Sequence, residues 1–222
     1  MGSPVLEIRN VSVGAEPAFC RDVSFAVDAG EAVAVLGGEG AGKSQLLRCI
    51  GLELAPSSGS VLLDGIEVTG ATGLDRNELK GRAIELVHPP SSPDADSATD
   101  TAGSSAVSRR PTATMPVTWM RQRIQIARAV TQATAALLLD EPFAGIDHGV
   151  RVRIEELLHR ARREAGTAVV VATRDTSVAR HVADRVVVLH QGEVVESGPT
   201  DGVLDAPSDA RTRALVTVRR SA

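Results

Sequence analysis

The sequence predicts an α/β fold with a parallel sheet at its core and a smaller antiparallel β portion beside it. Through the second half of the chain, short apolar runs alternate with segments of helical periodicity, as in repeated βαβ units. In the N-terminal part, strand-like segments follow one another with only turns between them, which favours antiparallel pairing. A glycine-rich stretch also joins an apolar run directly to a helical segment. Together these observations indicate a three-layer α/β domain with right-handed crossovers.

Composition limits the class of protein. The chain has 222 residues, 43% of them hydrophobic, which is enough for one α/β domain with a large core. Aromatic residues make up only 2%, so we expect Val, Leu, Ile and Ala to form that core. The net charge of −4 gives no electrostatic footprint for nucleic acid, which is therefore not expected as a partner. Cys20 and Cys49 lack metal-ligand spacing and are expected to be buried thiols in a reducing compartment. With no signal peptide or long apolar run, the chain is not expected to cross a membrane.

The N-terminal elements are predicted from alternating polarity and from turn residues. Val23, Phe25 and Val27 alternate with polar residues, which indicates a strand with one buried face. Gly30 and Gly59 mark turns between neighbouring elements. In order, we predict strands at 5–13, 23–27, 32–36, 60–65 and 83–87, with helices at 43–54 and 74–80.

Residues 89–118 have a different composition. Ser, Thr, Ala and Asp dominate 91–105 and offer almost nothing to bury, so we expect a flexible loop there. Helical periodicity resumes at Arg121, with Ile124, Ala127 and Val130 predicted on one apolar face. The remaining predicted elements are strands at 136–140, 167–173, 185–189 and 194–195, with helices around 154–161 and at 175–184.

The glycine-rich stretch carries the first functional signal. It has the spacing G-x-x-x-x-G-K-S between a predicted buried strand and a predicted helix. Glycines at this spacing let backbone N–H groups curve around a phosphate, the lysine reaches the β- and γ-phosphate oxygens, and the serine hydroxyl ligates Mg²⁺. An ordinary glycine-rich turn is the alternative, and the full pattern in its strand-to-helix context makes it the weaker interpretation. The residues expected to contact a nucleotide are Gly37, Gly38, Glu39, Gly40, Ala41, Gly42, Lys43, Ser44 and Gln45.

A second signal is a pair of acids at the end of an apolar run. Asp140 and Glu141 follow the run 136–139, and the carboxyl ends of parallel strands meet at one edge of a sheet. We therefore expect Asp140 beside the phosphate-binding loop as a Mg²⁺ ligand, direct or through water. Glu141 is expected to polarise the water that attacks a γ-phosphate. The alternative is a pair of surface acids that cap the next helix. This is the weaker interpretation, because the same chain contains the glycine-rich loop.

Over nearly its whole length, the chain resembles the nucleotide-binding subunits of ABC transporters. Gly37 to Ser44 matches the Walker A motif, Leu137 to Glu141 the Walker B motif with its catalytic glutamate, and Ala144 to Asp147 is similar to the D-loop. The resemblance implies ATP and Mg²⁺ as ligands, with Asp147 as a further nucleotide contact. It also implies integral membrane permease subunits as partners, and a cytoplasmic location on the inner face of the cell membrane.

Some segments resemble one group within that family. The segments 81–87, 120–123 and 196–199 are similar to the ATPases of oligopeptide, dipeptide and nickel importers. This resemblance implies an importer that couples ATP binding and hydrolysis to transport through a separate permease.

The chain also departs from the family at several motifs. Where the family has LSGGQ or LSGGM, this chain has Pro116-Val117-Thr118-Trp119-Met120. The Q-loop glutamine appears as His88 and the switch histidine as Arg174, and both are carried forward as candidate catalytic residues. Residues 89–118 stand where the family has a helical subdomain that receives the permease, so a truncated subdomain is expected within a single domain, 1–222.

Two interpretations follow from these matches and departures. In the first, the chain is an ATPase subunit that works beside a second ABC ATPase subunit with an intact signature, and is a weak enzyme in isolation. In the second, it binds ATP but hydrolyses it weakly, as a structural or regulatory subunit of a heterodimer. An unrelated P-loop kinase is a remote third, because it would leave Asp140, Glu141 and the D-loop resemblance unexplained.

Overall fold

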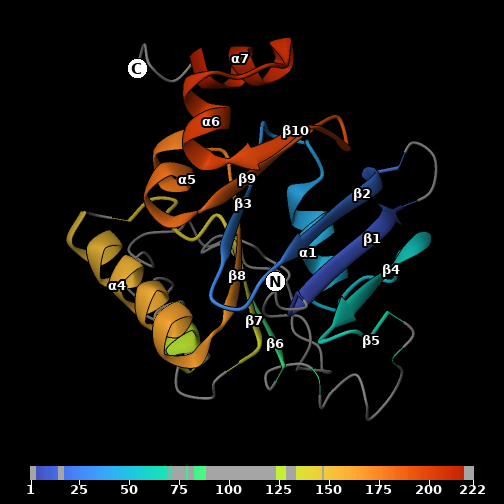
Figure 1. Cartoon of the computed structure of the whole chain (residues 1–222), viewed down its shortest axis with the longest axis vertical. Coiled ribbons are helices and arrows are strands. Elements are labelled where there is room, and N and C mark those ends of the chain that lie inside the picture. Colours follow the sequence, from blue (N-terminus) through green and yellow to red (C-terminus); the bar gives the residue numbers. More distant parts are fainter. Residues whose placement is uncertain are drawn as a thin grey trace, which may run out of the picture.

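The structure is a computed structural model that describes residues 4–14, 18–69, 71, 79, 83–88, 124–128, 134–146 and 148–217. Within these ranges, the strands form two sheets (Figure 1). The larger contains, in spatial order, β10 (Glu193–Pro199), β9 (Arg185–His190), β3 (Ala32–Gly37), β8 (Ala168–Thr173), β7 (Ala136–Asp140) and β6 (Ile84–Val87). The smaller contains β2 (Cys20–Val27), β1 (Leu6–Val13), β4 (Ser58–Leu63) and β5 (Ile66–Glu67).

The strand directions confirm the predicted parallel core and antiparallel portion. In the larger sheet β9, β3, β8, β7 and β6 run parallel, and only β10 is antiparallel to its neighbour. The smaller sheet is antiparallel throughout. Leu36 pairs with Thr173, and Asp140 pairs with Ala172. This register brings the carboxyl ends of β3, β7 and β8 to one edge of the sheet.

The helix that follows the glycine-rich loop joins the two sheets into one core. Helix α1 (Lys43–Ile50) lies between them (Figure 1), and Leu46 packs in the same apolar cluster as Ile8 of β1 and Leu138 of β7. On the other face of the larger sheet, Ile154 packs in a cluster with the β7 residues Leu137 and Leu139. Because side chains alternate along a strand, β7 contributes to both clusters.

The remaining described helices pack on the face of the larger sheet away from α1. Helix α4 (His148–Ala165) and helix α5 (Thr176–Val182) contribute to the cluster on the face of the sheet away from α1. Helices α6 (Thr200–Asp205) and α7 (Ala210–Thr217) follow β10 and pack in a third cluster with α5. None of the described helices is both long and apolar enough to cross a membrane.

The expected aliphatic core and buried cysteines are confirmed. Most of the buried hydrophobic residues are Val, Leu, Ile and Ala. Cys20 and Cys49 are both buried, and burial raises their thiol pKa values to about 11 and about 12. Both thiols therefore remain protonated at neutral pH.

Three sequence predictions are wrong in detail. The helix expected to reach residue 54 ends at Ile50, because Gly51 terminates it and Leu52 adopts a left-handed φ of +60°. Strand β10 is longer than predicted, since it pairs with β9 along its whole length. In the helical segment 124–128, Ile126 is fully buried while Ile124 is 53% exposed. A short run with apolar residues on two faces does not determine which face packs, and here the cluster around Ile154 receives Ile126.

Other predictions fall outside the described residues. They concern the helix at 74–80, the segment 89–118, the signature position 116–120, Val130 and Asp147.

Candidate nucleotide site

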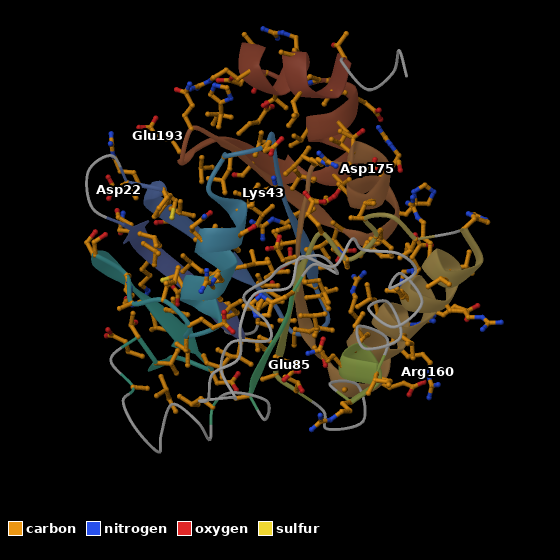
Figure 2. All side chains as sticks on the ribbon, turned by 180° about the vertical axis from the view of Figure 1, so that it is seen from behind. Asp22, Lys43, Glu85, Arg160, Asp175 and Glu193 are labelled. Carbon is orange, nitrogen blue, oxygen red and sulfur yellow. The ribbon has the colours of Figure 1, made fainter. Side chains whose placement is uncertain are left out.

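The sequence-predicted residues meet at the carboxyl edge of the larger sheet. The glycine-rich loop follows β3, His88 follows β6, Asp140 ends β7, and Arg174 follows β8. These segments are far apart in the sequence, and the parallel register of their strands makes them neighbours. Seen from behind, Lys43 lies at the start of α1 and Asp175 at the start of α5 (Figure 2).

The last glycine of the loop, Gly42, cannot be replaced by a larger residue without strain. Gly42 has a φ of +95°, and a Cβ there would lie 2.1 Å from the carbonyl oxygen of Phe19. Gly37 is crowded in the same way, because a Cβ there would lie 2.5 Å from the carbonyl oxygen of Leu189. Backbone just before β2 and near the end of β9 therefore packs directly against the loop, which holds it beside the N-terminus of α1.

The Lys43 ammonium lies inside this loop. Its side chain is 8% exposed, and Nζ donates to the carbonyl oxygens of Gly37 and Gly38, both at 2.9 Å. Burial lowers the pKa of Lys43, while the negative charges of Glu141 and Asp140 oppose that shift. The lysine is thus a largely buried cation whose hydrogen bonds are made to neutral carbonyls. Phosphate oxygens can replace those carbonyls with a gain in electrostatic energy.

Asp140 and Ser44 form a donor set that fits a magnesium ion. Asp140 is 4% exposed, and its Oδ1 atom is buried without a hydrogen-bond partner among the described residues. Burial raises the pKa of Asp140, and a hydrogen bond from the Ser44 hydroxyl opposes the rise. An unpaired buried carboxylate oxygen is costly unless something else binds it. A hard cation that takes oxygen ligands fits this position.

Glu141 has an unusual backbone conformation. Its φ is +44°, and its N–H donates to the carbonyl oxygen of Ala172 at 2.9 Å. A left-handed conformation costs a non-glycine residue roughly 1–2 kcal/mol. Because it interrupts the strand geometry directly after Asp140, it changes the direction in which the Glu141 side chain leaves the sheet. Burial raises the pKa of Glu141, and the Lys43 charge opposes that rise.

Two contacts of the Glu141 carboxylate connect it to neighbouring elements. Oε1 lies 3.8 Å from Lys43 Nζ, and Oε2 accepts a hydrogen bond of 3.3 Å from the Thr173 hydroxyl. The sequence predicts Thr173 only as a strand residue. Its position at the carboxyl end of an apolar strand, next to a candidate site residue, was the available signal.

Arg174, the residue after β8, lies beside Glu141. Its side chain is exposed and helps to line a cavity of about 220 Å³ together with Glu141 and Phe143. Burial dominates the raised pKa of Glu141, and the positive charge of Arg174 is a weaker influence that lowers it. The structure therefore brings the Arg174 charge close enough to act on the carboxylate.

His88 is held by a residue that sequence analysis missed. Its Nε2 atom lies 3.1 Å from Glu53 Oε1, just after the end of α1, and Arg48 Nε lies 3.4 Å from the same carboxylate. The hydrogen bond to Glu53 raises the pKa of His88, and the Asp140 charge adds to the rise. No spacing in the sequence pairs His88 with Glu53, because the contact depends on where α1 ends.

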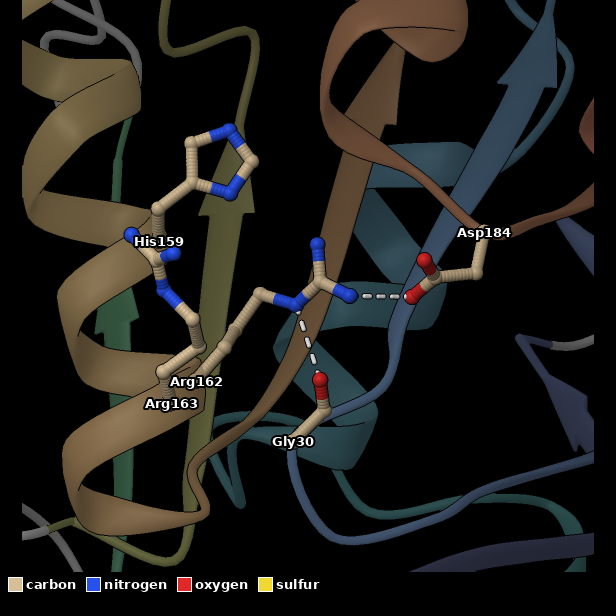
Figure 3. A pocket seen from close by; sticks show the side chains of 5 residues that line it. All are labelled: Gly30, His159, Arg162, Arg163 and Asp184. Atoms are coloured by element: carbon tan, nitrogen blue, oxygen red, sulfur yellow. Dashed lines mark hydrogen bonds and ion pairs between the residues drawn. The ribbon is translucent and has the colours of Figure 1, made fainter.

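A second cavity lies at the opposite edge of the larger sheet, where its parallel strands begin. Its volume is about 350 Å³, and His159, Arg162 and Asp184 are among the residues that line it (Figure 3). The Arg162 guanidinium donates to the carbonyl oxygens of Gly30 and Val182 and pairs with Asp184. The charge of Arg162 is therefore already balanced by Asp184, and its guanidinium connects α4 to the backbone just before β3.

Comparison with known proteins identifies the family. The ABC transporter family model matches residues 20–101. PhnK of Escherichia coli K12, an ATP-binding protein named for phosphonates utilization, is 31% identical, with 97% of this chain and 98% of that protein covered. The phosphate import ATP-binding protein PstB 2 of Natronomonas pharaonis is 32% identical, with 95% and 86% covered. The di/tripeptide transport ATP-binding protein DppF of Pseudomonas aeruginosa is 31% identical, with 87% and 69% covered.

Solved structures agree at the level of the fold. A bacterial ABC transporter cassette solved as a dimer superposes with a TM-score of 0.68 at 22% identity, covering 88% of this chain and 98% of that one. An ATP-binding subunit of an ABC transporter gives 0.69 at 20% identity, with 96% and 98% covered. The fold is thus the ABC type of the P-loop NTPases, with a mixed sheet and an antiparallel β subdomain. The chain belongs to the ABC transporter family as an ATP-binding cassette.

Proposed function

We propose that the chain binds MgATP at the site described above and hydrolyses it as an ATPase subunit of an ABC importer. The observation that carries the proposal is the meeting of Lys43, Ser44, Asp140 and Glu141 at one sheet edge, where the buried Asp140 Oδ1 has no partner among the described residues. Each of these groups has a use in phosphoryl transfer, where the protein contributes mostly placement and electrostatics.

The residues have separate roles in this proposal. The backbone N–H groups of residues 37–45 surround the β-phosphate, and Lys43 exchanges its two carbonyl acceptors for phosphate oxygens. Ser44 and Asp140 hold Mg²⁺, which supplies positive charge to the phosphates. Glu141 orients the attacking water and accepts its proton. Arg174 and His88 are candidates for further contacts on the γ-phosphate side, and Asp147 is a candidate nucleotide contact outside the described residues.

The proposed assembly is a heterodimer on membrane permease subunits, at the inner face of the cell membrane. In the family, the signature of one subunit contacts the γ-phosphate held by the other. Here Pro116 removes a backbone donor, Val117 has no hydroxyl, and Trp119 places a large side chain where backbone must approach the phosphate. A second ATPase subunit with an intact signature would complete the site that this chain builds. The chain is proposed as one domain whose helical subdomain, 89–118, is shortened.

The transported substrate is proposed to be a peptide or a nickel complex. Support comes from the similarity of residues 81–87, 120–123 and 196–199 to that group of importers, and from the match to DppF, which is named for di- and tripeptide transport. The matches to PhnK and PstB 2 carry other substrate names. A second candidate function is a regulatory subunit that binds ATP with little turnover, which the replacement of the switch histidine by Arg174 favours.

ATP hydrolysis with and without a partner subunit tests the proposal. We expect slow turnover by the isolated chain and faster turnover after addition of an ABC ATPase subunit that has an intact signature and whose own catalytic glutamate is disabled. Glu141→Gln should abolish the increase, whereas Glu156→Gln, on the exposed face of α4, should leave it unchanged. Equal rates for the isolated chain and the complex, or a complex unaffected by Glu141→Gln, would contradict the proposed mechanism.

A further inference from the structure

We infer that Thr173 is a positioning residue for the Glu141 carboxylate. The inference rests on the proposed function of Glu141 in hydrolysis and adds a residue to it. Thr173 is the last residue of β8 and is 2% exposed. Its hydroxyl donates to Glu141 Oε2 at 3.3 Å and accepts a hydrogen bond from the Asp175 N–H at 3.0 Å.

The hydrogen bond from the Asp175 N–H orients the Thr173 hydroxyl as a donor to the Glu141 carboxylate. A hydroxyl group has one hydrogen to donate and two lone pairs to accept with. Because the Asp175 N–H occupies a lone pair, the hydroxyl hydrogen remains available for the carboxylate. Accepting one hydrogen bond also polarises the hydroxyl and makes it a better donor. Asp175 is itself fixed as the N-cap of α5, since its side chain accepts from the Ser177 N–H at 2.8 Å.

The backbone of Glu141 is already fixed, so Thr173 acts on the side chain. The Glu141 N–H is bonded to Ala172, and the left-handed φ sets where the side chain begins. The carboxylate can then rotate between two neighbours, the Lys43 ammonium at 3.8 Å and the Thr173 hydroxyl. Phosphate oxygens compete with Glu141 for Lys43 once ATP is bound. Of these two contacts, the one to Thr173 does not compete with the nucleotide.

A second threonine, just before the same strand, provides a matched comparison. Thr167 directly precedes β8, at the end of the strand opposite to Thr173, and is fully buried. Its Oγ1 atom has no hydrogen-bond partner among the described residues. The two side chains thus share chemistry and burial, and they differ in their hydrogen bonds, since Thr173 contacts the carboxylate and the Asp175 N–H.

Single-turnover hydrolysis, with protein in excess over radiolabelled ATP, tests this role because it detects slow chemistry. Thr173→Val keeps the shape and removes the hydroxyl. We expect it to lower the rate at saturating protein by about 10- to 100-fold, the cost of a misplaced catalytic group or a lost charge-assisted hydrogen bond. The protein concentration that gives half of the maximal rate should stay within about threefold of the wild-type value, since binding depends on other groups. Thr173→Ser should restore most of the rate, and Thr167→Val should match the wild type.

The outcomes separate this inference from the function on which it rests. A wild-type rate in Thr173→Val, with Glu141→Gln inactive, would overturn the role of Thr173 and leave that of Glu141 standing. A wild-type rate in Glu141→Gln would instead overturn the proposed mechanism. Crystal structures of the wild type and Thr173→Val decide the positioning role even where no hydrolysis is measurable. The Glu141 carboxylate should be ordered in the first and displaced or disordered in the second, and an unchanged carboxylate would overturn the inference.

Discussion

The Lys43 ammonium lies 3.8 Å from the Glu141 carboxylate, with 8% and 23% of the two side chains exposed. The proximity of this cation opposes the effect of burial on Glu141, which would otherwise raise the pKa of the carboxyl further. A general base must be ionised at working pH. The residue proposed to bind the phosphate therefore also favours the charged form of the residue proposed to accept a proton.

Removal of the Lys43 ammonium should weaken ATP binding. A charge-assisted contact contributes about 1.5–3 kcal/mol, so we expect Lys43→Ala to raise the dissociation constant for MgATP at least about tenfold. Isothermal titration calorimetry measures this directly. Arg163→Ala, which removes a positive charge from the exposed side of α4, is the control and should bind like the wild type. Equal affinities for wild type and Lys43→Ala would show that the loop is not the phosphate site.

Two glycines of the same loop should differ in their tolerance of alanine. Gly40 has a φ of +72° with no atom within 4 Å of a Cβ, so Gly40→Ala adds conformational strain of about 1–2 kcal/mol. For a domain of this size each kcal/mol lowers Tm by roughly 2–4 °C. Gly42→Ala adds the same strain and also a clash at 2.1 Å with the Phe19 carbonyl oxygen. We expect its Tm to fall by at least twice as much, as measured by circular dichroism. Similar Tm values for the two variants would contradict the crowding at Gly42.

The sequence predicted those parts of the site that follow from local pattern and parallel topology. Lys43 and Ser44 belong to one contiguous motif, and Asp140 ends a short run of apolar residues that predicts a buried strand. Parallel strands then bring these segments to one edge whatever the details of packing. The carbonyl partners of Lys43, and the Asp140 oxygen that has no partner within the described ranges, are consequences of this arrangement.

The missed contacts depend on features without a local signature. Glu53 reaches His88 because α1 ends four residues earlier than its apolar pattern suggested. Thr173 reaches Glu141 because Glu141 adopts a left-handed φ, which nothing in its residue type predicts. Ile126 replaces Ile124 in the core for a similar reason, since packing against α4 selects the buried face.

The pairing of His88 with Glu53 should make the stability of the fold depend on pH. The Glu53 hydrogen bond raises the pKa of His88 in the folded state above its value in the unfolded chain, about 6.5. A raised folded pKa stabilises the fold fully below that unfolded value, and the stabilisation is lost as pH rises through the folded pKa. His88→Gln, which stays neutral, should therefore have a lower Tm than the wild type at pH 6 and a similar Tm at pH 9. His159→Gln, at an exposed position of α4, is the control. A Tm difference independent of pH would contradict the pairing.

The altered signature should prevent ATP-dependent self-association of this chain. A bacterial ABC transporter cassette of the same fold was solved as a dimer. In the proposed assembly the signature of one subunit contacts the γ-phosphate held by the other. In this chain Pro116, Val117 and Trp119 occupy the signature position, so two copies would form two sites that each lack the γ-phosphate contacts.

Glu141→Gln removes the proposed base and should slow hydrolysis, which in a competent cassette would trap the closed dimer. We expect this variant of the present chain to remain monomeric in sedimentation velocity with saturating MgATP, at the same sedimentation coefficient as without nucleotide. Glu141→Gln combined with Lys43→Ala, which should not bind ATP, provides the reference for an unliganded monomer. An ATP-dependent dimer that disappears in this double variant would show that the altered signature still supports closure, and a homodimer would then replace the proposed heterodimer.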